Sequence, residues 1–310
     1  TRMGVAVLLA VSLLWGSSFM AIKIAAADIG AVGIAAGRLV VAAALLSLTA
    51  AALRARLPAS ARVWGRLLAL SIVGQMAPFF CLGLAGQFTS SSNAAMMMGA
   101  APLLTLLFGR FFESGDPWHA RLWIGLAIGL AGVVVALGRP EQARDLAVSG
   151  DWAGKAAALL AAAGYALGAL LSRSLRDEVP LTMTVATTMT ISAVAMSAVW
   201  IALNAGAIAA GDFAVPGTTS LVALGLLGAA NTALAYFVYF WLIRREGATF
   251  ASLNNYLVPV LGVLLGTLVL DEPYRPDALA GLALILGGIA LVRLRGLPRH
   301  GMSVFGRQRD

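Results

Sequence analysis

The sequence predicts an all-α integral membrane protein whose ten transmembrane helices form two inverted five-helix repeats. Composition is the first observation, because 60% of the residues are hydrophobic and 12% are charged, whereas soluble domains carry about 25% charged residues. Apolar runs of about twenty residues, each long enough to cross a hydrocarbon core of about 30 Å, recur along the chain. The two halves of the chain also match each other. Because backbone groups cannot stay unpaired in lipid, we expect these runs to be helices.

Charged or turn-rich breaks divide the chain into ten expected spans. In order, the spans cover residues 4–26, 32–52, 66–84, 91–111, 122–137, 152–171, 181–203, 220–242, 248–270 and 278–292. An alternative for the first run is a cleaved signal peptide that ends at Ala25-Ala26-Ala27. The run is longer than a usual signal core and contains Lys23, so we expect it to remain as the first span.

The placement of basic residues predicts that both termini are cytoplasmic. If the N-terminus lies inside, most of the arginines fall on the cytoplasmic side, as the positive-inside rule requires. The opposite side then holds Arg139, Arg144, Lys155 and Arg275. The formal charge of +8 therefore follows from membrane topology, and we do not expect a nucleic-acid partner. The basic segment at 295–310 is expected to lie near anionic lipid headgroups.

An internal repeat divides the chain into two halves of five spans. Trp15 matches Tyr165 at an offset of 150 residues, and Pro102 matches Pro259 at an offset of 157. Because five is an odd number, the second half must enter the membrane from the opposite side. Inverted repeats of this kind are typical of secondary transporters, which bind their substrates near the midplane. The expected units are a first repeat at 1–138, a linker at 139–151, a second repeat at 152–294 and a cytoplasmic tail at 295–310.

Several motifs together resemble a known family. They are the segment WGSSFMAIK at 15–23 followed by Arg38, the proline-centred fourth and ninth spans, the breaks Asp116-Pro117 and Glu272-Pro273, and the glycine-rich fifth and tenth spans. The chain resembles the drug/metabolite transporter superfamily, in particular its ten-helix EamA-type members, which include YddG-type exporters of aromatic and other hydrophobic amino acids. The resemblance implies a secondary transporter, an exporter or a facilitator, that moves small amphipathic metabolites across a bacterial inner membrane by alternating access. Its partners would be a small-molecule substrate and the lipid bilayer.

Aromatic, amide and methionine side chains near the predicted midplane are the candidates for contact with a solute. Rings stack and thioethers adapt their shape, so a wall of such residues with a few amides suits an amphipathic molecule that has an apolar side chain. The alternative at each position is helix packing or contact with lipid. The candidates for substrate binding are Trp15, Phe19, Gln75, Phe79, Met97, Tyr165, Tyr236, Tyr239, Asn254 and Asn255.

Three prolines are expected to kink helices along the pathway. Pro78, Pro102 and Pro259 each remove the hydrogen bond to the carbonyl four residues earlier. A free carbonyl at membrane depth needs a protein or water partner. The kinked helices therefore either line a wet cavity or are sealed by packing, and the matched positions of Pro102 and Pro259 favour the cavity.

Two of the charges within the expected spans are candidates for a role in the pathway. Lys23 and Arg38 lie near the predicted outer ends of the first two spans, where a long side chain can extend to the interface. Each is either an interface anchor or an outer-vestibule charge that meets a substrate carboxylate. All 14 acidic residues fall in loops or at helix ends, so no proton or sodium relay is visible. This pattern favours facilitated transport over ion coupling.

Other classes of protein fit the sequence less well. A membrane enzyme would need a nucleophile with a base, or metal ligands, at depth, but His119 and His300 fall in a loop and in the tail. We expect no metal and no cofactor. A carrier of nucleotide sugars or sugar phosphates stays an alternative, although the mid-helix positions offer no lysine or arginine for phosphate, and so does a channel or scaffold. The chain is expected to be a monomer or a homodimer, with Gly125, Gly129 and Gly132 allowing close helix packing.

Overall fold

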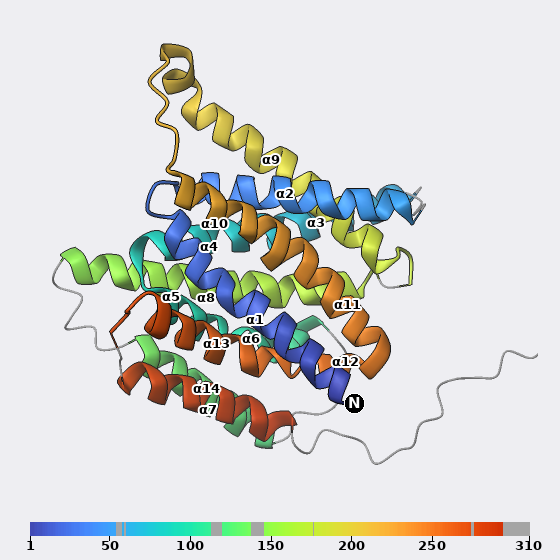
Figure 1. Ribbon diagram of the computed structural model, residues 1–310. Coiled ribbons are helices and arrows are strands. Elements are labelled where there is room, and N and C mark those ends of the chain that lie inside the picture. Colours follow the sequence, from blue (N-terminus) through green and yellow to red (C-terminus); the bar gives the residue numbers. More distant parts are fainter. Residues whose placement is uncertain are drawn as a thin grey trace, which may run out of the picture.

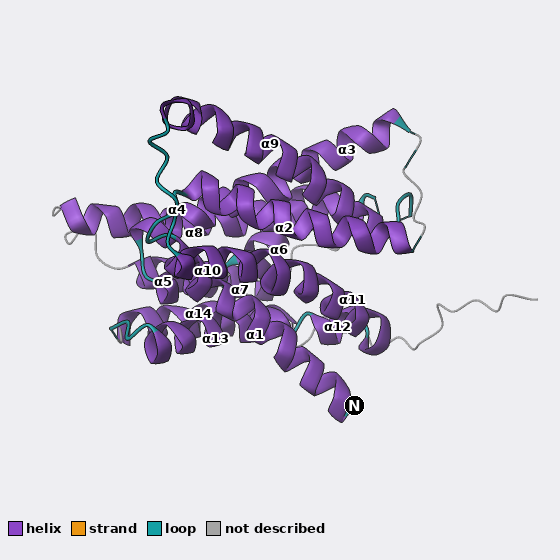
Figure 2. Ribbon diagram, turned by 45° about the horizontal axis from the view of Figure 1, so that its top comes forward, coloured by secondary structure: helices purple, strands orange, loops and turns teal. Residues whose placement is uncertain are grey.

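The computed structural model describes residues 1–53, 58, 60–112, 120–137, 146–175, 177–273 and 276–293, and every regular element in these ranges is a helix. The Asp116-Pro117 break, both histidines, most of the linker at 139–151 and the tail at 295–310 lie outside the described residues. Figures 1 and 2 show the helices packed into one bundle.

The helices follow the expected spans in order along the chain. The first half contains α1 (Arg2–Ala25), α2 (Ala31–Ala52), α3 (Ala61–Ser71), η1 (Ile72–Met76), α4 (Ala77–Phe88), α5 (Ser91–Met98), α6 (Ala101–Phe112) and α7 (Ala120–Leu137). The second half contains α8 (Leu146–Arg173), α9 (Leu181–Ala210), α10 (Thr218–Gly228), η3 (Ala229–Leu234), α11 (Ala235–Glu246), α12 (Ala248–Ala251), α13 (Asn254–Val269) and α14 (Pro276–Arg293). Seven described helical stretches are long and apolar enough to cross a membrane, and three shorter apolar helices lie at Trp123–Ala136, Asn254–Val269 and Leu279–Leu291. The number of ten spans, the inversion of the repeats and the cytoplasmic termini stay predictions.

The helix ends follow local chemistry that the apolar runs alone do not reveal. The hydroxyl of Thr1 accepts a hydrogen bond from the backbone N–H of Gly4 and caps the start of α1, as hydroxyl side chains commonly do. The helix α9 continues to Ala210, past the expected end at residue 203. It ends at Gly211, whose φ of 73° is a left-handed conformation that glycine adopts without strain.

Two expected spans are broken rather than continuous. A turn at Gly99 and Ala100 separates α5 from α6, so Pro102 falls in the first turn of a new helix, where its missing N–H removes no helical bond. A second turn, at 252–253, separates α12 from α13, while Pro259 lies inside α13. The two prolines therefore act differently, because only Pro259 interrupts the bonding within a helix.

Two short π-helical segments lie within the expected third and eighth spans. The first, η1, continues directly from α3 into α4, and the second, η3, links α10 to α11. Their starts at Ile72 and Ala229 are 157 residues apart, which is also the offset between Pro102 and Pro259. Segments of this kind are rare and occur often at functional sites.

The packing pairs spans from the two halves of the chain. The helices α7 and α14 contact each other at the bottom of Figure 1, and α2 contacts α9 at the top. Between these pairs, α8 contacts α4, α5 and α6, while α1 contacts α10, α11 and α13. The first helix of each half therefore packs against the third and fourth spans of the other half.

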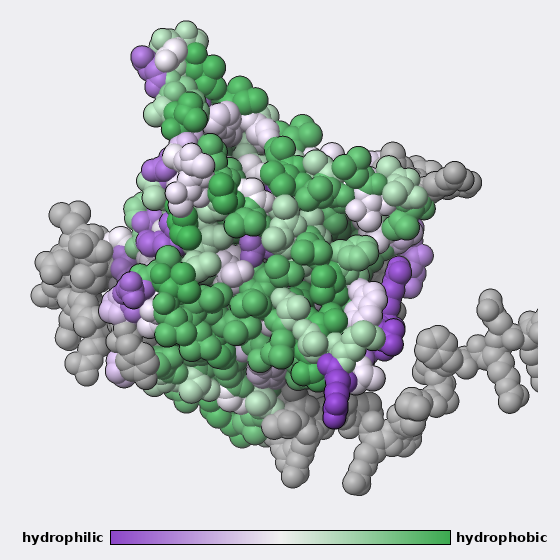
Figure 3. Space-filling view, in the orientation of Figure 1, coloured by the Kyte–Doolittle hydropathy of each residue, from purple (hydrophilic) through white to green (hydrophobic). Residues whose placement is uncertain are grey.

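The surface carries the composition of a lipid-facing protein. Large apolar side chains such as Leu48, Val194 and Leu268 are about two-thirds exposed or more. Figure 3 shows a broad hydrophobic face, with hydrophilic residues gathered chiefly near the helix ends. Contiguous apolar surface of this extent marks a membrane contact, because lipid tails take the place of water around it.

Candidate functional site

A cavity of about 330 Å³ lies inside the bundle where α1, α2, α4, α5, α6, α8, α11 and α13 meet. The volume falls at the lower end of the range for small-molecule sites, roughly 300–1,000 Å³. Aromatic side chains, amides and helix-breaking positions dominate its wall. It is lined by Trp15, Ser18, Phe19, Arg38, Phe79, Leu82, Met98, Ala101, Pro102, Tyr165, Ala169, Tyr236, Tyr239, Asn254, Asn255, Val258 and Pro259.

Small residues bring the two helices on one side of the cavity close together. A Cβ atom added at Gly16 of α1 would lie 2.9 Å from the Cβ of Leu261 and 3.3 Å from the backbone nitrogen of Gly262, both in α13. The crossing of α1 and α13 is therefore as close as glycine permits. It places the ring of Phe19, 3.0 Å from the position of a Cβ at Gly262, beside the cavity.

Aromatic rings form two clusters on the cavity wall. The ring of Trp15 lies 5.8 Å from that of Tyr236 and 4.9 Å from that of Tyr239, measured between centroids. On the other side, Phe79 and Tyr165 meet edge to face at 6.1 Å. These distances lie within the range of favourable aromatic pairs. The rings hold one another in place and present a rigid apolar surface to a solute.

The guanidinium group of Arg38 belongs to the same wall. Its Nε atom donates a hydrogen bond of 2.8 Å to the hydroxyl of Thr232 in η3, and its Cζ atom lies 4.1 Å from the centroid of the Phe79 ring. Thr232 donates in turn to the carbonyl of Leu227, five residues earlier. The residue Arg38 is 5% exposed, so it does not extend to the interface. The expectation of an interface anchor is wrong for this side chain, because it turns into the bundle.

The two π-helical segments supply polar groups next to the cavity. Gln75 in η1 is 6% exposed and interacts with the side chain of Tyr236, while its Oε1 atom has no hydrogen-bond partner among the described residues. Thr232 in η3 holds Arg38. Gln75 and Thr232 are 157 residues apart, so the repeat offset relates the two segments and also the two polar side chains.

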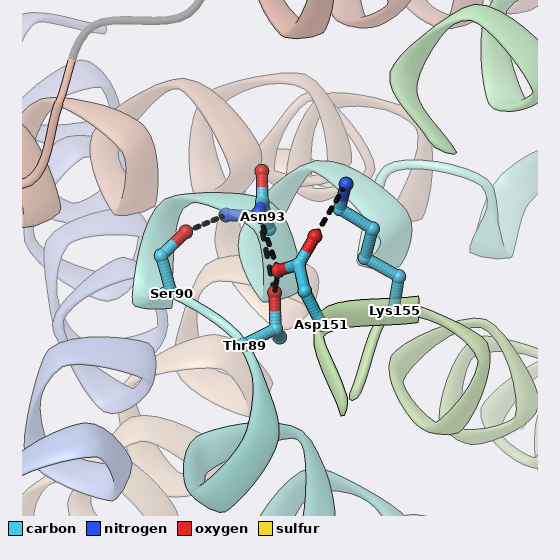
Figure 4. A network of polar contacts seen from close by, with 5 residues as sticks. All are labelled: Thr89, Ser90, Asn93, Asp151 and Lys155. Carbon is cyan, nitrogen blue, oxygen red and sulfur yellow. Dashed lines mark hydrogen bonds and ion pairs between the residues drawn. The ribbon is translucent and has the colours of Figure 1, made fainter. Parts of the chain in front are cut away.

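A polar network lies beyond the cavity at one end of the bundle, which we call the Thr89 end. The carboxylate of Asp151 accepts a hydrogen bond of 2.5 Å from the Thr89 hydroxyl and one of 3.2 Å from the Asn93 amide, and it pairs with Lys155 at 2.8 Å (Figure 4). Lys155 was expected among the loop charges, but it is 1% exposed. Its position in the third turn of α8 buries the aliphatic part of the side chain. The carboxylate of Asp151, one turn earlier, neutralises its charge.

Lys23 joins the first helix to this network. Its Nζ atom donates hydrogen bonds of 3.1 Å to the carbonyl of Gly86 and 2.8 Å to that of Thr89, at the end of α4. Cations at helix C-termini commonly bind the last carbonyls in this way. Lys23 is four residues beyond Phe19, which lines the cavity, a rise of about 6 Å along the helix. The network therefore lies about one helical turn beyond the cavity lining, at the Thr89 end of the bundle.

A second connection at the same end joins the two halves of the chain. The carboxylate of Glu272 accepts hydrogen bonds from the backbone N–H groups of Ser91 and Ser92, at 2.6 and 2.9 Å. Ser92 also donates its hydroxyl to this carboxylate at 2.5 Å. An anion at a helix N-terminus is favoured by the unpaired N–H groups and by the helix dipole. Glu272 therefore fixes the start of α5 to the end of α13.

Comparison with known families identifies the chain. Two stretches, residues 2–138 and 152–294, match the model of the EamA-like transporter family. The chain belongs to this family. Its apolar helices, together with an inner-membrane relative, support a multi-pass protein of the inner membrane.

The relatives carry transporter names. The chain is 29% identical over 210 residues to the uncharacterized inner membrane transporter YedA of Escherichia coli (strain K12), and it spans 63% of that relative's length. It is 26% identical over 287 residues to a probable terminal-alkyne amino-acid exporter of Streptantibioticus cattleyicolor, covering 92% of each chain. A solved crystal structure of a protein with 20% identity aligns over 95% of this chain and 97% of its own, with a TM-score of 0.61, which shows the fold alone.

Most of the residues predicted as site candidates lie together around the cavity of this EamA-like transporter. Met97 does not line it, because its side chain is fully buried in the core, and the next residue, Met98, lines it instead. Gln75 is not among the lining residues but interacts with Tyr236, and Pro78 packs outside the lining against α8. The residues around the cavity that were predicted are Trp15, Phe19, Phe79, Tyr165, Tyr236, Tyr239, Asn254, Asn255, Arg38, Pro102 and Pro259.

Other lining residues of the EamA-like transporter carried weaker signals in the sequence. Ser18 belongs to the small-residue segment of the first span, and Met98 to the methionine run before Pro102. Leu82 and Ala169 are one turn from Phe79 and Tyr165, on the same helix faces. Apolar side chains of this kind are common in every span, so their place at the cavity follows from tertiary packing.

Proposed function

We propose that this protein is a secondary transporter, an exporter or a facilitator, that moves small amphipathic metabolites, in particular aromatic or other hydrophobic amino acids, by alternating access. The aromatic cavity inside the bundle carries the proposal, because its walls suit a solute with a ring or a branched apolar chain. The name of one relative, a probable terminal-alkyne amino-acid exporter, supports the proposal. Such a solute is amphipathic and of the size that this cavity would hold.

The packing supports the symmetry that alternating access needs. In an inverted repeat, a contact between the first span of one half and the third and fourth spans of the other must occur twice, with the halves exchanged. The contacts of α8 with α4, α5 and α6 and of α1 with α10, α11 and α13 follow that pattern. Rocking of such halves around a central site is the usual mechanism of transporters with inverted repeats.

The cavity has different surroundings at its two ends. At the Thr89 end, the bonds of Lys23 join α1 to α4 and those of Glu272 join α5 to α13. Toward the other end, Ala169 lines the cavity and is exposed. We infer that the cavity is reached from the Ala169 end in this conformation. With the predicted orientation, that end faces the cytoplasm.

Two alternatives lead to different measurements. A carrier of nucleotide sugars or sugar phosphates would need several cations around the phosphate, whereas Arg38 is the one charged residue among the described lining residues. The sequence predicted no mid-helix cation at the site, and this prediction is wrong because Arg38 lines the cavity. A channel would give flux that does not saturate and that is not stimulated by solute on the opposite side.

The test is uptake into proteoliposomes across a panel of amino acids, purines, organic cations and sugar phosphates, with and without a proton gradient. We expect saturable flux of aromatic and branched amino acids that is stimulated by counter-substrate and independent of the gradient. Uphill accumulation driven by a proton gradient would refute facilitated transport, and preference for sugar phosphates would refute the substrate class.

Tyr236 is the residue for a mutational test of the site. Replacing it by alanine removes a ring that contacts Trp15 and Phe240, so we expect the half-saturation concentration to rise roughly three- to tenfold, from about 0.5–1.5 kcal/mol per aromatic contact. The matched control is Phe237→Ala, because Phe237 is the next residue and its side chain is 57% exposed. Equal flux in the Tyr236 variant and the wild type would exclude this ring from the pathway.

A further inference from the structure

Arg38 is a buried cation that pairs with no carboxylate among the residues that the structure describes. The residue is 5% exposed and lines the cavity. Its Nε atom donates a hydrogen bond to the Thr232 hydroxyl. In the part of the chain that the structure describes, the two terminal nitrogens bind no acceptor and the guanidinium pairs with no carboxylate. A charge held at depth without a partner is unfavourable. Such an arrangement indicates that the partner comes from outside the protein.

The neighbours of the guanidinium fix its orientation without neutralising it. The face of Phe79 lies against it at 4.1 Å, a cation–π contact that stabilises the charge in part. Thr232 holds one edge through Nε. The two terminal amino groups are left for a planar anion, and their fork matches the two oxygens of a carboxylate.

The rest of the wall decides what kind of anion fits. The cavity is lined mostly by rings and apolar side chains, with Arg38 as the one charge among the described lining residues. One cation matches a monoanion, whereas a phosphate dianion needs more. The same wall contains no carboxylate to pair with an ammonium group. Recognition of charge in this cavity is therefore directed at an anion.

We propose that the guanidinium of Arg38 binds the carboxylate of the transported solute, so that the cavity selects aromatic and other apolar carboxylates and does not need an amino group. This inference rests on the proposed function, in which the cavity is the transport site. It goes further by naming the group that is recognised, and it predicts that a deaminated acid is accepted as well as the amino acid.

The test compares three ligands that share one ring. Calorimetric titration of the purified full chain would use L-phenylalanine, 3-phenylpropionate without the amino group, and phenethylamine without the carboxylate, and a separate titration would use phenyl phosphate. We expect the two carboxylates to bind with similar affinity and the amine to bind at least about tenfold more weakly, as loss of a hydrogen bond to a charged group implies. Equal binding of the amine, tighter binding of phenyl phosphate, or no binding of either carboxylate would overturn the proposal. This comparison of ligands uses the wild-type protein and does not depend on the folding of a variant.

Variants separate recognition from a purely structural role. In Arg38→Gln we expect carboxylate affinity to fall at least about tenfold while the affinity for phenethylamine is unchanged, and Arg38→Lys should recover part of the loss. A structural role would instead weaken all three ligands together, which would refute the assignment. The control is Arg245→Gln, because Arg245 lies over Trp241 outside the cavity.

Flux measurements distinguish failure of this inference from failure of the proposed function. If carboxylates bind through Arg38 but proteoliposomes carry no saturable flux, the proposed function fails and the carboxylate site stands. If saturable flux occurs for amines and carboxylates alike and Arg38→Gln does not alter their ratio, the transporter stands and the carboxylate site is refuted.

Discussion

Gly288 provides a direct test of the helix packing, because a single methyl group there would meet backbone atoms. A Cβ added at Gly288 would lie 2.5 Å from the carbonyl oxygen of Gly125 and 2.8 Å from the backbone nitrogen of Gly129. Ordinary van der Waals contact begins at about 3.4 Å, so α14 would have to move away from α7 by several tenths of an ångström. Overpacking of this kind destabilises by about 1–3 kcal/mol.

The neighbouring residue supplies a matched control on the same helix. A Cβ added at Gly287 meets nothing within 4 Å, so Gly287→Ala adds the same methyl group without a clash. Alanine also favours a helix over glycine by up to about 1 kcal/mol. We therefore expect Gly288→Ala to unfold at a lower temperature than the wild type and Gly287→Ala at the same or a higher temperature. The measurement is thermal unfolding of each purified variant in the same detergent.

The comparison can refute the packing argument in two ways. Equal unfolding temperatures for Gly288→Ala and Gly287→Ala would show that α7 and α14 do not lie this close. A larger loss in Gly287→Ala would show that the opposite face of α14 is the packed one. Since helix–helix association in membranes depends on close packing by small residues, the result also measures how strongly this pair contributes to the fold.

Two further variants test the polar connections at the Thr89 end. Glu272→Ala should lower the free energy of unfolding by about 1–3 kcal/mol, because the backbone N–H groups that begin α5 lose their acceptor. The control is Asp212→Ala, which removes an exposed loop carboxylate. Equal thermal stability of the two variants would contradict the prediction. Lys155→Met should destabilise more than Arg66→Met, since it leaves Asp151 without its buried ion pair, whereas the exposed pair of Arg66 is worth roughly 0–1 kcal/mol. A smaller effect for Lys155 in the same unfolding assay would show that its burial is not linked to the pair.

The positions of the charges explain why one of them was placed wrongly from the sequence. Lys23 and Arg38 both lie a few residues from a predicted interface, and the apolar pattern around them is the same. Their surroundings differ in space, because Lys23 meets the free carbonyls at the end of α4, whereas Arg38 meets Thr232 and Phe79 within the bundle. Partners more than 40 residues away in the chain decide the direction of each side chain.

The breaks within the expected spans were also predictable only in part from the sequence. The prolines were visible, and their matched positions were a sound guide to the region of the cavity. Whether a proline starts a helix, as Pro102 does, or interrupts one, as Pro259 does, depends on the turn before it. The π-helical segments have no signature of their own in the sequence, because a π bond pattern arises where packing favours one extra residue in a turn.

The sequence by itself determined the membrane class, the order of the helices and most of the residues around the cavity, because a bilayer imposes length and polarity on every span and the prolines and amides are rare enough to stand out. Tertiary structure alone decided that Arg38 is buried with no carboxylate partner among the described residues, that Met98 rather than Met97 lines the cavity, and that Asp151 and Lys155 pair at the Thr89 end. These features depend on which helix faces meet. Helix contact is set by close packing between segments far apart in the chain, and a hydropathy pattern contains no information about it.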